Sequence, residues 1–591
     1  MNWSERCLWK DLSAIRLVRV LALSSVVAMA AQNTAIAQDD SPQARLRGPT
    51  ASAVVNLIRA LVQEGVLTQD KAQTLIRQAE DEAAVAARSQ QEPSALPAST
   101  AEVQSSTTAT SVRVPYIPKI VRKQIKDELK DEVLQEARSE NWAAPNAIPE
   151  WTKHFHLDGD FRFRYEWDIF DSRNSNTFPN FAALDAGSPF DLNNSAGTPP
   201  PILDTTENRQ RMRIRARLGI GIDIADGFVA GIRLATGNTT NPVSTNQTLG
   251  TTLNKDSFVL DRAFLKYRPA DWATISVGRF ANPWLYTDLV WDDDIAFDGI
   301  AAQFNPELSK NLSILTTAGA FPIENTPFSF PDNTIFKTGR RDKWLFAAQG
   351  GFDWQPRQGY DFKLAAAYYH FRNLEGQRSD PCVANSSADP CDTDNSRPGF
   401  LQQGNTLFAI RNLVSSVTNP PVFQYYGLAT PFHEMDVTAR FDISRLGDIH
   451  IVFDGDVVKN LAFSSRGVAA RNPVNNIGPD KMSWTTPIPG TYDGGSLGYQ
   501  VRATVGYPEV RERWQWNLSA AYKYLQSDAV PDAFTDSDFH LGGTNAKGYI
   551  IGATLGVAHN INVAARWSSA SEVTGMPYTV DVVQVDVNAR F

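Results

Sequence analysis

The last nine residues of the chain, Val583 to Phe591, alternate apolar and polar side chains without interruption. Successive side chains of a β-strand point to opposite faces, so this segment predicts a strand with one apolar and one polar face. The same pattern recurs between Arg211 and Ile224, where four arginines occupy every second position of the polar face. Such a row requires water or counter-charges beside it. The sheet is therefore expected to have an aqueous space on one side and an apolar medium on the other.

The alternation continues from residue 151 to residue 591 and predicts about sixteen strands. The expected connections take turns between short ones, such as residues 225–227, and long ones, such as residues 372–431. This arrangement is typical of an up-and-down barrel, whose closure removes the unpaired strand edges that lipid could not solvate. The predicted fold class is an all-β transmembrane protein, an antiparallel up-and-down β-barrel with a small α-helical N-terminal extension.

Composition favours a barrel over a bundle of membrane-spanning helices. After residue 37, no apolar run reaches the length of about 20 residues that a spanning helix needs. A barrel places its lipid-facing residues at every second position, so a mean hydropathy of −0.30 does not argue against a membrane. The formal net charge of −9 argues against a nucleic acid partner, for which a basic domain is expected.

The first 150 residues have a different character from the rest. Residues 1–37 combine a basic start, a short apolar segment and small residues at Ala35 and Ala37, which predicts a signal peptide for export. Residues 38–82 predict a helical hairpin, residues 83–114 a disordered linker and residues 115–150 a charged amphipathic helix. Two interpretations of the last helix stay open, a possible coiled coil between copies of the chain and a helix exposed to the periplasm.

The chain contains three cysteines, of which Cys7 belongs to the predicted signal peptide. Cys382 and Cys391 are separated by eight residues. An even pair in an exported chain predicts one disulfide that clamps a loop tip. A metal site is not expected, because no CxxC pair exists and the nearest histidine is distant in sequence.

A strand that ends the chain on an aromatic residue such as Phe591 is a mark of outer-membrane β-barrel proteins. Three further segments, Trp151–Tyr165, Glu207–Arg217 and Gly278–Pro283, look like those of one family of such barrels. On these residues the chain resembles the porins of Gram-negative outer membranes that carry a helical N-terminal extension. The resemblance implies a homotrimeric diffusion channel in outer-membrane lipid, with its N-terminal extension in the periplasm.

The polar strand faces supply the candidate pore, and we expect seven arginines to line it: Arg162, Arg164, Arg211, Arg213, Arg215, Arg217 and Arg233. The connection between the fifth and sixth strands carries Asp288, Asp292, Asp293 and Asp294. In sixteen-stranded general porins, the loop at this place folds inward, so we expect a constriction loop. Opposed charges across a constriction create a transverse field that orients polar solutes. Two other interpretations stay open: the aspartates cap a turn, or they bind a cation such as Ca²⁺ on an outer loop.

The expected function is passive diffusion of small hydrophilic solutes or ions. The arginines favour anions, although Asp158, Asp160, Glu166 and Asp223 and the aspartates of the constriction loop can offset them. Catalysis is not expected, since the seven histidines are scattered and no GxSxG motif occurs, so no catalytic residue or cofactor is predicted. The alternative is an envelope tether or adhesin, in which the barrel only anchors and the helices bind peptidoglycan or a periplasmic partner.

Overall fold

The computed structural model describes residues 150–193, 200–332, 334–416, 418–479, 481–483, 486–488 and 490–591. The predicted signal peptide, helical hairpin and linker lie outside these residues, as does the charged helix except for its last residue. Within the described part of the chain, no helix is both long and apolar enough to cross a membrane.

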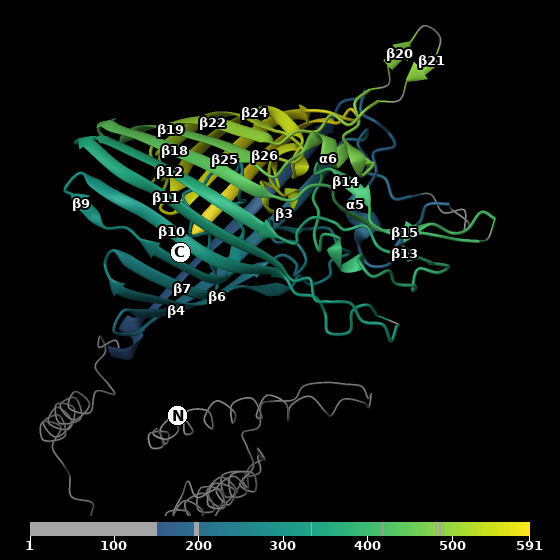
Figure 1. Cartoon of the computed structure of the whole chain (residues 1–591). Helices are drawn as coiled ribbons and strands as arrows, with labels where there is room; N and C mark the ends of the chain where they lie inside the picture. Colours follow the sequence, from purple (N-terminus) through teal and green to yellow (C-terminus); the bar gives the residue numbers. More distant parts are fainter. Residues whose placement is uncertain are drawn as a thin grey trace, which may run out of the picture. The chain divides into compact units, whose positions relative to one another are not determined.

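Sixteen strands form one closed antiparallel sheet, which confirms the barrel that the alternation predicts (Figure 1). Strand β1 closes the barrel by pairing with β3 on one side and with β26 on the other, and the short strands β5 (Gln247–Thr248) and β9 (Glu307–Ser309) extend the sheet. In chain order the sixteen are β1 (Phe155–Phe170), β3 (Arg209–Ala225), β4 (Phe228–Thr236), β6 (Phe258–Ala270), β7 (Ala273–Ala281), β8 (Ala296–Phe304), β10 (Leu312–Glu324), β11 (Lys343–Arg357), β12 (Tyr360–Arg372), β18 (His433–Leu446), β19 (Ile449–Asn460), β22 (Leu497–Gly506), β23 (Trp516–Leu525), β24 (Ala546–Ala558), β25 (Ile561–Glu572) and β26 (Thr579–Arg590).

The end of the chain takes part in the closure. The backbone N–H and C=O of Phe591 exchange hydrogen bonds of 3.0 Å with those of Gly159 in β1. A Cβ atom at position 159 would collide with the Phe591 ring, so the glycine leaves the space that the aromatic side chain occupies. The terminal aromatic residue that marks the sequence is thus packed onto the first strand.

The alternation in the sequence becomes two faces of the barrel wall. On β3, the apolar residues Met212, Leu218, Ile220 and Ile224 are exposed on the outer face. The arginines between them lie on the inner face, where Arg213 and Arg215 are paired in register with Arg164 and Arg162 of β1. An apolar outside and a charged inside are expected of a barrel that spans a membrane.

The two ends of the barrel differ in the length of their connections. At one end, β3 joins β4 through Asp226 and Gly227, both with positive φ, as a two-residue hairpin turn requires. The connection from β8 to β10, which contains β9, also lies at this end, and the sequence pattern did not single it out. The long connections lie at the other end and hold the small elements α5 (Phe181–Asp185), α6 (Ser465–Ala470), β13 (Pro381–Cys382) and β15 (Asn412–Leu413) (Figure 1).

The longest connection, between β12 and β18, contains both remaining cysteines. Cys382 and Cys391 form a disulfide with an S–S distance of 2.04 Å. Strand β13, which carries Cys382, pairs with β15 of the same connection. The disulfide therefore fastens a segment that already has a short ladder of its own.

Candidate functional site

The connection between β7 and β8, residues 282–295, folds into the barrel, and we call it the inner loop. Its apolar side chains Trp284, Leu289, Val290 and Trp291 are buried. The rings of Trp284 and Trp291 lie 5.5 and 5.3 Å from that of Tyr369, on the inner face of β12. Aromatic pairs at these distances stabilise a fixed arrangement. The inner loop is thus packed on the barrel wall by an apolar core of its own.

Asp288 fastens one end of the inner loop to the wall formed by β22 and β23. Its carboxylate accepts hydrogen bonds of 2.8 and 2.9 Å from Nη2 of Arg502 and one of 2.5 Å from Nε2 of Gln500. Lys523 donates to the backbone oxygen of Asp288 at 3.0 Å. Burial alone would raise the pKa of Asp288, but the charges of Arg502 and Lys523 lower it well below its usual range. The carboxylate is therefore ionised and held by two cations.

Asp294 fastens the other end of the loop to β3. One carboxylate oxygen accepts from Nη1 of Arg215 at 3.4 Å and of Arg217 at 3.2 Å, and the other accepts from the Thr245 backbone and hydroxyl. Burial would raise the pKa of Asp294, and the two arginines lower it. Five barrel strands separate β3 from β22 on the shorter path around the sheet. The inner loop therefore reaches two separate parts of the wall from inside the barrel.

The other two aspartates of the inner loop have different surroundings. Asp292 is buried and accepts a hydrogen bond of 2.9 Å from the Ser537 backbone, and its own N–H donates to the backbone oxygen of Phe534. Burial and the charges of Asp536 and Asp294 raise the pKa of Asp292 well above its usual value. Asp293 is exposed and accepts a hydrogen bond of 3.3 Å from the Tyr286 hydroxyl.

A second segment from the long-connection end also turns inward: residues 526–545, between β23 and β24, which we call the second inner loop. Its Asp538 accepts hydrogen bonds of 2.8 and 3.0 Å from Arg164, and its Asp536 lies 3.1 Å from Nζ of Lys523. Together with the contacts of Asp292, these pairs join the second inner loop to the first and to two strands of the wall. The sequence pattern of this loop did not predict that it folds inward.

The inner face of β1 and β3, which we call the arginine wall, carries six of the seven predicted arginines. Most of these side chains contact carboxylates: Arg164 contacts Asp586 and Asp538, Arg211 and Arg213 contact Glu166, and Arg215 and Arg217 contact Asp160. The seventh, Arg233 on β4, contacts Asp261. The row of arginines is thus compensated by carboxylates of the barrel wall and the loops, and not by water alone.

Arg162 differs from its neighbours on the arginine wall. It donates a hydrogen bond of 2.5 Å to the Asn246 side chain, its Nε has no partner, and it forms no ion pair with the described residues. In register it lies beside Arg215, which is bound to Asp294 of the inner loop. Among the described residues, no carboxylate therefore contacts Arg162 directly, and the charges of Asp294, Asp538 and Asp586 act on it from a greater distance.

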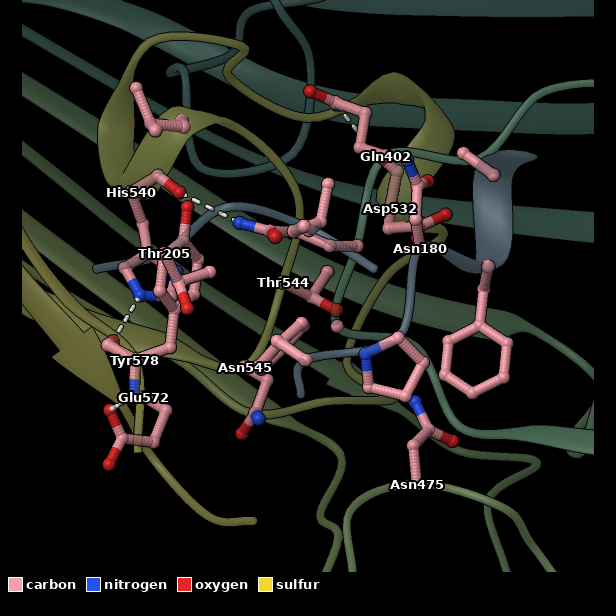
Figure 2. Close-up of a pocket in the computed structure, with 18 of the residues that line it drawn as sticks. Asn180, Thr205, Gln402, Asn475, Asp532, His540, Thr544, Asn545, Glu572 and Tyr578 are labelled. Carbon is pink, nitrogen blue, oxygen red and sulfur yellow. Dashed lines mark hydrogen bonds between the residues drawn. The ribbon is translucent and has the colours of Figure 1, made fainter. Parts of the chain in front are cut away.

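A cavity of about 820 Å³ lies between the arginine wall and the long connections. Arg209, Arg211 and Arg213 line one side of it, and residues of the second inner loop, including Asp532 and His540, line another. Figure 2 shows side chains from several connections, among them Asn180, Gln402 and Tyr578, arranged around this space. A volume of this size is in the range of small-molecule binding sites.

Hydrogen bonds between connections fix the cavity wall. Nε2 of Gln402 donates to the backbone oxygen of Asp532 at 2.6 Å, and Nε2 of Gln403 donates to that of His540 at 2.8 Å (Figure 2). Burial lowers the pKa of His540 to about 4 and raises that of Asp532 to about 7. At neutral pH His540 is therefore uncharged, and Asp532 carries only part of its charge.

The structure brings together the predicted arginines and the predicted loop aspartates on the inside of the barrel. It adds Arg502, Lys523, Asp536 and Asp538, which the sequence analysis missed, although the polar face of β22 already contained Arg502. Among the described residues, no group of three or more His, Cys, Asp or Glu side chains is arranged to hold a metal ion.

A family model described as "Putative porin" matches residues 51–591. Solved structures similar to this chain include OprB of Pseudomonas putida, with 9% identity, a TM-score of 0.38 and coverage of 74% of this chain and 94% of that one. The outer membrane channel DcaP of Acinetobacter baumannii and OmpF of Salmonella typhi each have 10% identity, a TM-score of 0.35 and coverage of 74% of this chain and 97% of theirs. No curated protein matches the chain.

Proposed function

This chain belongs to the porin family, and on that premise we propose that its outer-membrane channel admits small hydrophilic solutes by passive diffusion through a passage bounded by the inner loop. The observation that supports this proposal best is the attachment of the loop at Asp288 and Asp294 to separate parts of the wall. Opposed fixed charges favour polar solutes over apolar ones, because they orient dipoles and hold water.

We propose a preference for anions, which rests on Arg162. Asp160, Glu166 and Asp168 of the arginine wall are engaged by arginines, whereas no carboxylate among the described residues forms an ion pair with Arg162. A fixed positive charge that is not neutralised raises the local concentration of anions.

The test is the reversal potential of purified protein in a planar bilayer under a KCl gradient. Arg162→Glu should shift the potential toward cation selectivity, and the double change Arg213→Glu with Arg215→Glu should shift it in the same direction. Arg511→Glu is the matched control, because this arginine is exposed and pairs with Glu509 in the turn between β22 and β23. An unchanged reversal potential in the Arg162→Glu variant would refute the proposal that Arg162 causes the anion preference.

We further propose that the channel is a homotrimer and that its N-terminal extension lies in the periplasm. The chain enters β1 at the end of the barrel that has the short connections, which is the periplasmic end in barrels of this kind. Light scattering in detergent tests the trimer, and a monomer mass would contradict it. Deletion of residues 38–145 should leave conductance intact, whereas a protein that acts only as a tether to peptidoglycan would lose its role and show no conductance in either form.

A further inference from the structure

The cavity beside the arginine wall has a lining of mixed chemistry. One side consists of guanidinium groups. Another consists of aromatic rings: Tyr578 lies 5.2 Å from Phe178 and 6.2 Å from Phe170, and all three residues line the cavity. A ligand that satisfies both sides needs a charged group and an apolar body.

The guanidinium side presents positive charge to the cavity. Side-chain exposure is 49% for Arg209, 22% for Arg211 and 15% for Arg213, but 1% for Glu166 and 0% for Asp168. These two carboxylates are thus less exposed than the arginines, and together they serve four cations, because Glu166 also lies 4.0 Å from Arg164. A solute that enters the cavity meets guanidinium groups before it meets their counter-charges.

These arginines also keep hydrogen-bonding capacity. Both ion pairs of Arg211 use Nη2, so its Nη1 has no hydrogen bond with the described residues. The contacts of Arg213 with Glu166 and Ser244 are long, at 3.4 and 3.5 Å. Arginine binds carboxylate groups through paired N–H donors, and such charge-assisted bonds are stronger than neutral ones.

The acidic residues that line the cavity differ in how far they oppose an anion. Asp204 and Glu572 accept hydrogen bonds from the backbone of Glu207 and Tyr578, form no ion pair with the described residues, and do oppose it. His540 packs against Tyr578 at 4.4 Å and is uncharged at neutral pH. Asp532 faces the cavity from the second inner loop but is partly protonated there. Asp538 is already bound to Arg164.

We propose that this cavity binds a small organic carboxylate with an aromatic or branched apolar body, whose carboxylate contacts Arg211 and Arg213 while its body packs against Phe178 and Tyr578. Bound here, the solute would be collected from the long-connection side before it passes the inner loop. The inference deepens the proposed channel function and rests on it, because it names a class of solute for that channel.

Calorimetric titration of the full-length protein in detergent tests the site with three probes: benzoate, benzyl alcohol and acetate. Benzoate should bind at least about tenfold more tightly than either of the others, because only benzoate has both the charge and the ring. Equal affinities for benzoate and acetate, or for benzoate and benzyl alcohol, would overturn the proposal.

Two variants and a control locate the binding. Arg211→Gln with Arg213→Gln should weaken benzoate by about tenfold or more. Met576→Trp should weaken it as well, because Met576 lines the cavity, is exposed and leaves the ion pairs intact, so this variant remains informative if the arginine variant does not fold. Arg440→Gln is the control: its side chain lies on the inner face of β18, away from the cavity, and should leave the affinity unchanged. Full benzoate affinity in the Met576 variant would refute the location.

Conductance of the same preparations in KCl separates this inference from the channel itself. A protein that conducts KCl but does not discriminate benzoate would refute the binding site and leave the channel standing. A protein that binds benzoate as described but does not conduct would refute the channel and leave the binding site standing.

Discussion

Two parts of the barrel wall carry buried, inward-facing carboxylates, but only one of the two parts provides them with cationic partners. On the arginine wall, Glu166 and Asp168 are buried and contact two or more arginines. On β18 and β19, Glu434, Asp436 and Asp456 are equally buried but form no ion pair with the described residues, and both oxygens of Glu434 lack a partner. We call these three residues the acidic cluster.

The difference teaches that the same residue type on the same face has two roles. A buried carboxylate next to arginines compensates their charge, and its loss leaves cations unpaired. A buried carboxylate without a cation pays the full desolvation cost, so an amide of the same shape should serve as well or better. Substitutions from acid to amide therefore separate the two parts of the wall.

The largest effect is expected from Glu166→Gln on the arginine wall. The change leaves Arg211 and Arg213 without their shared carboxylate and should lower the free energy of unfolding by about 3–5 kcal/mol. Urea unfolding in detergent or lipid measures it. Glu509→Gln, which breaks an exposed pair with Arg511, should change it by less than about 1 kcal/mol. Equal losses of stability in the two variants would show that a buried ion pair on this wall contributes no more than an exposed one.

The second largest effect on stability is expected at Asp185, a buried carboxylate at the end of α5 and outside the barrel wall. Like the acidic cluster, Asp185 forms no ion pair with the described residues. Burial raises its pKa from 3.8 to about 7. A raised folded-state pKa stabilises the fold below pH 3.8, and this contribution is lost as pH rises toward 7. Asp185→Asn should therefore gain stability relative to the wild type across this interval, on the order of 3 kcal/mol in total. Parallel stability curves for the two proteins from pH 4 to pH 7 would contradict the argument.

A smaller effect is expected from Asp288→Asn, which weakens the attachment of the inner loop to Arg502 and Lys523. We expect a loss of about 2 kcal/mol, because Arg502 is partly exposed and Lys523 keeps its contact with Asp536. Single-channel recordings should show a noisier current, since the loop keeps its attachment at Asp294 but is released at the other end. A current as steady as that of the wild type would mean that Asp288 does not hold the loop.

The smallest effect is expected in the acidic cluster itself. At about pH 3, where an ordinary aspartate is mostly protonated, Asp456→Asn should change stability by less than about 1 kcal/mol in either direction. Asp456 has no cation to lose, and the remaining amide oxygen can still accept from the Thr287 hydroxyl. The same urea experiment applies. A loss as large as that of Glu166→Gln would show that a hidden counter-charge, such as a bound cation, accompanies the cluster.

Much of the barrel could be predicted from the sequence because strand faces are encoded locally. The alternation of Met212 and Arg213 and their successors specifies which side chains meet lipid, and it needs no knowledge of distant residues. The inner loop could be anticipated from its aspartates, and its buried Trp284 and Trp291 were an additional signal, since apolar side chains are unexpected in an outer connection.

The partners of the charged residues could not be predicted in the same way. Asp288 and Arg502 are 214 positions apart, and Arg164 and Asp538 are 374 positions apart. No local pattern encodes these contacts, because they depend on how far each connection folds into the barrel. For the same reason the second inner loop and the acidic cluster emerged only with the structure.

The most direct test of the central claim, that the inner loop borders the conducting passage, is the modification of Asp293→Cys by a water-soluble cationic thiosulfonate during single-channel recording. Asp293 is the exposed aspartate of that loop, and the native pair Cys382 and Cys391 is protected as a disulfide. We predict that modification lowers the current, whereas modification of Asp448→Cys, in an exposed turn, leaves it unchanged. Complete labelling of Asp293→Cys, verified by mass spectrometry, with no change in current would contradict the claim.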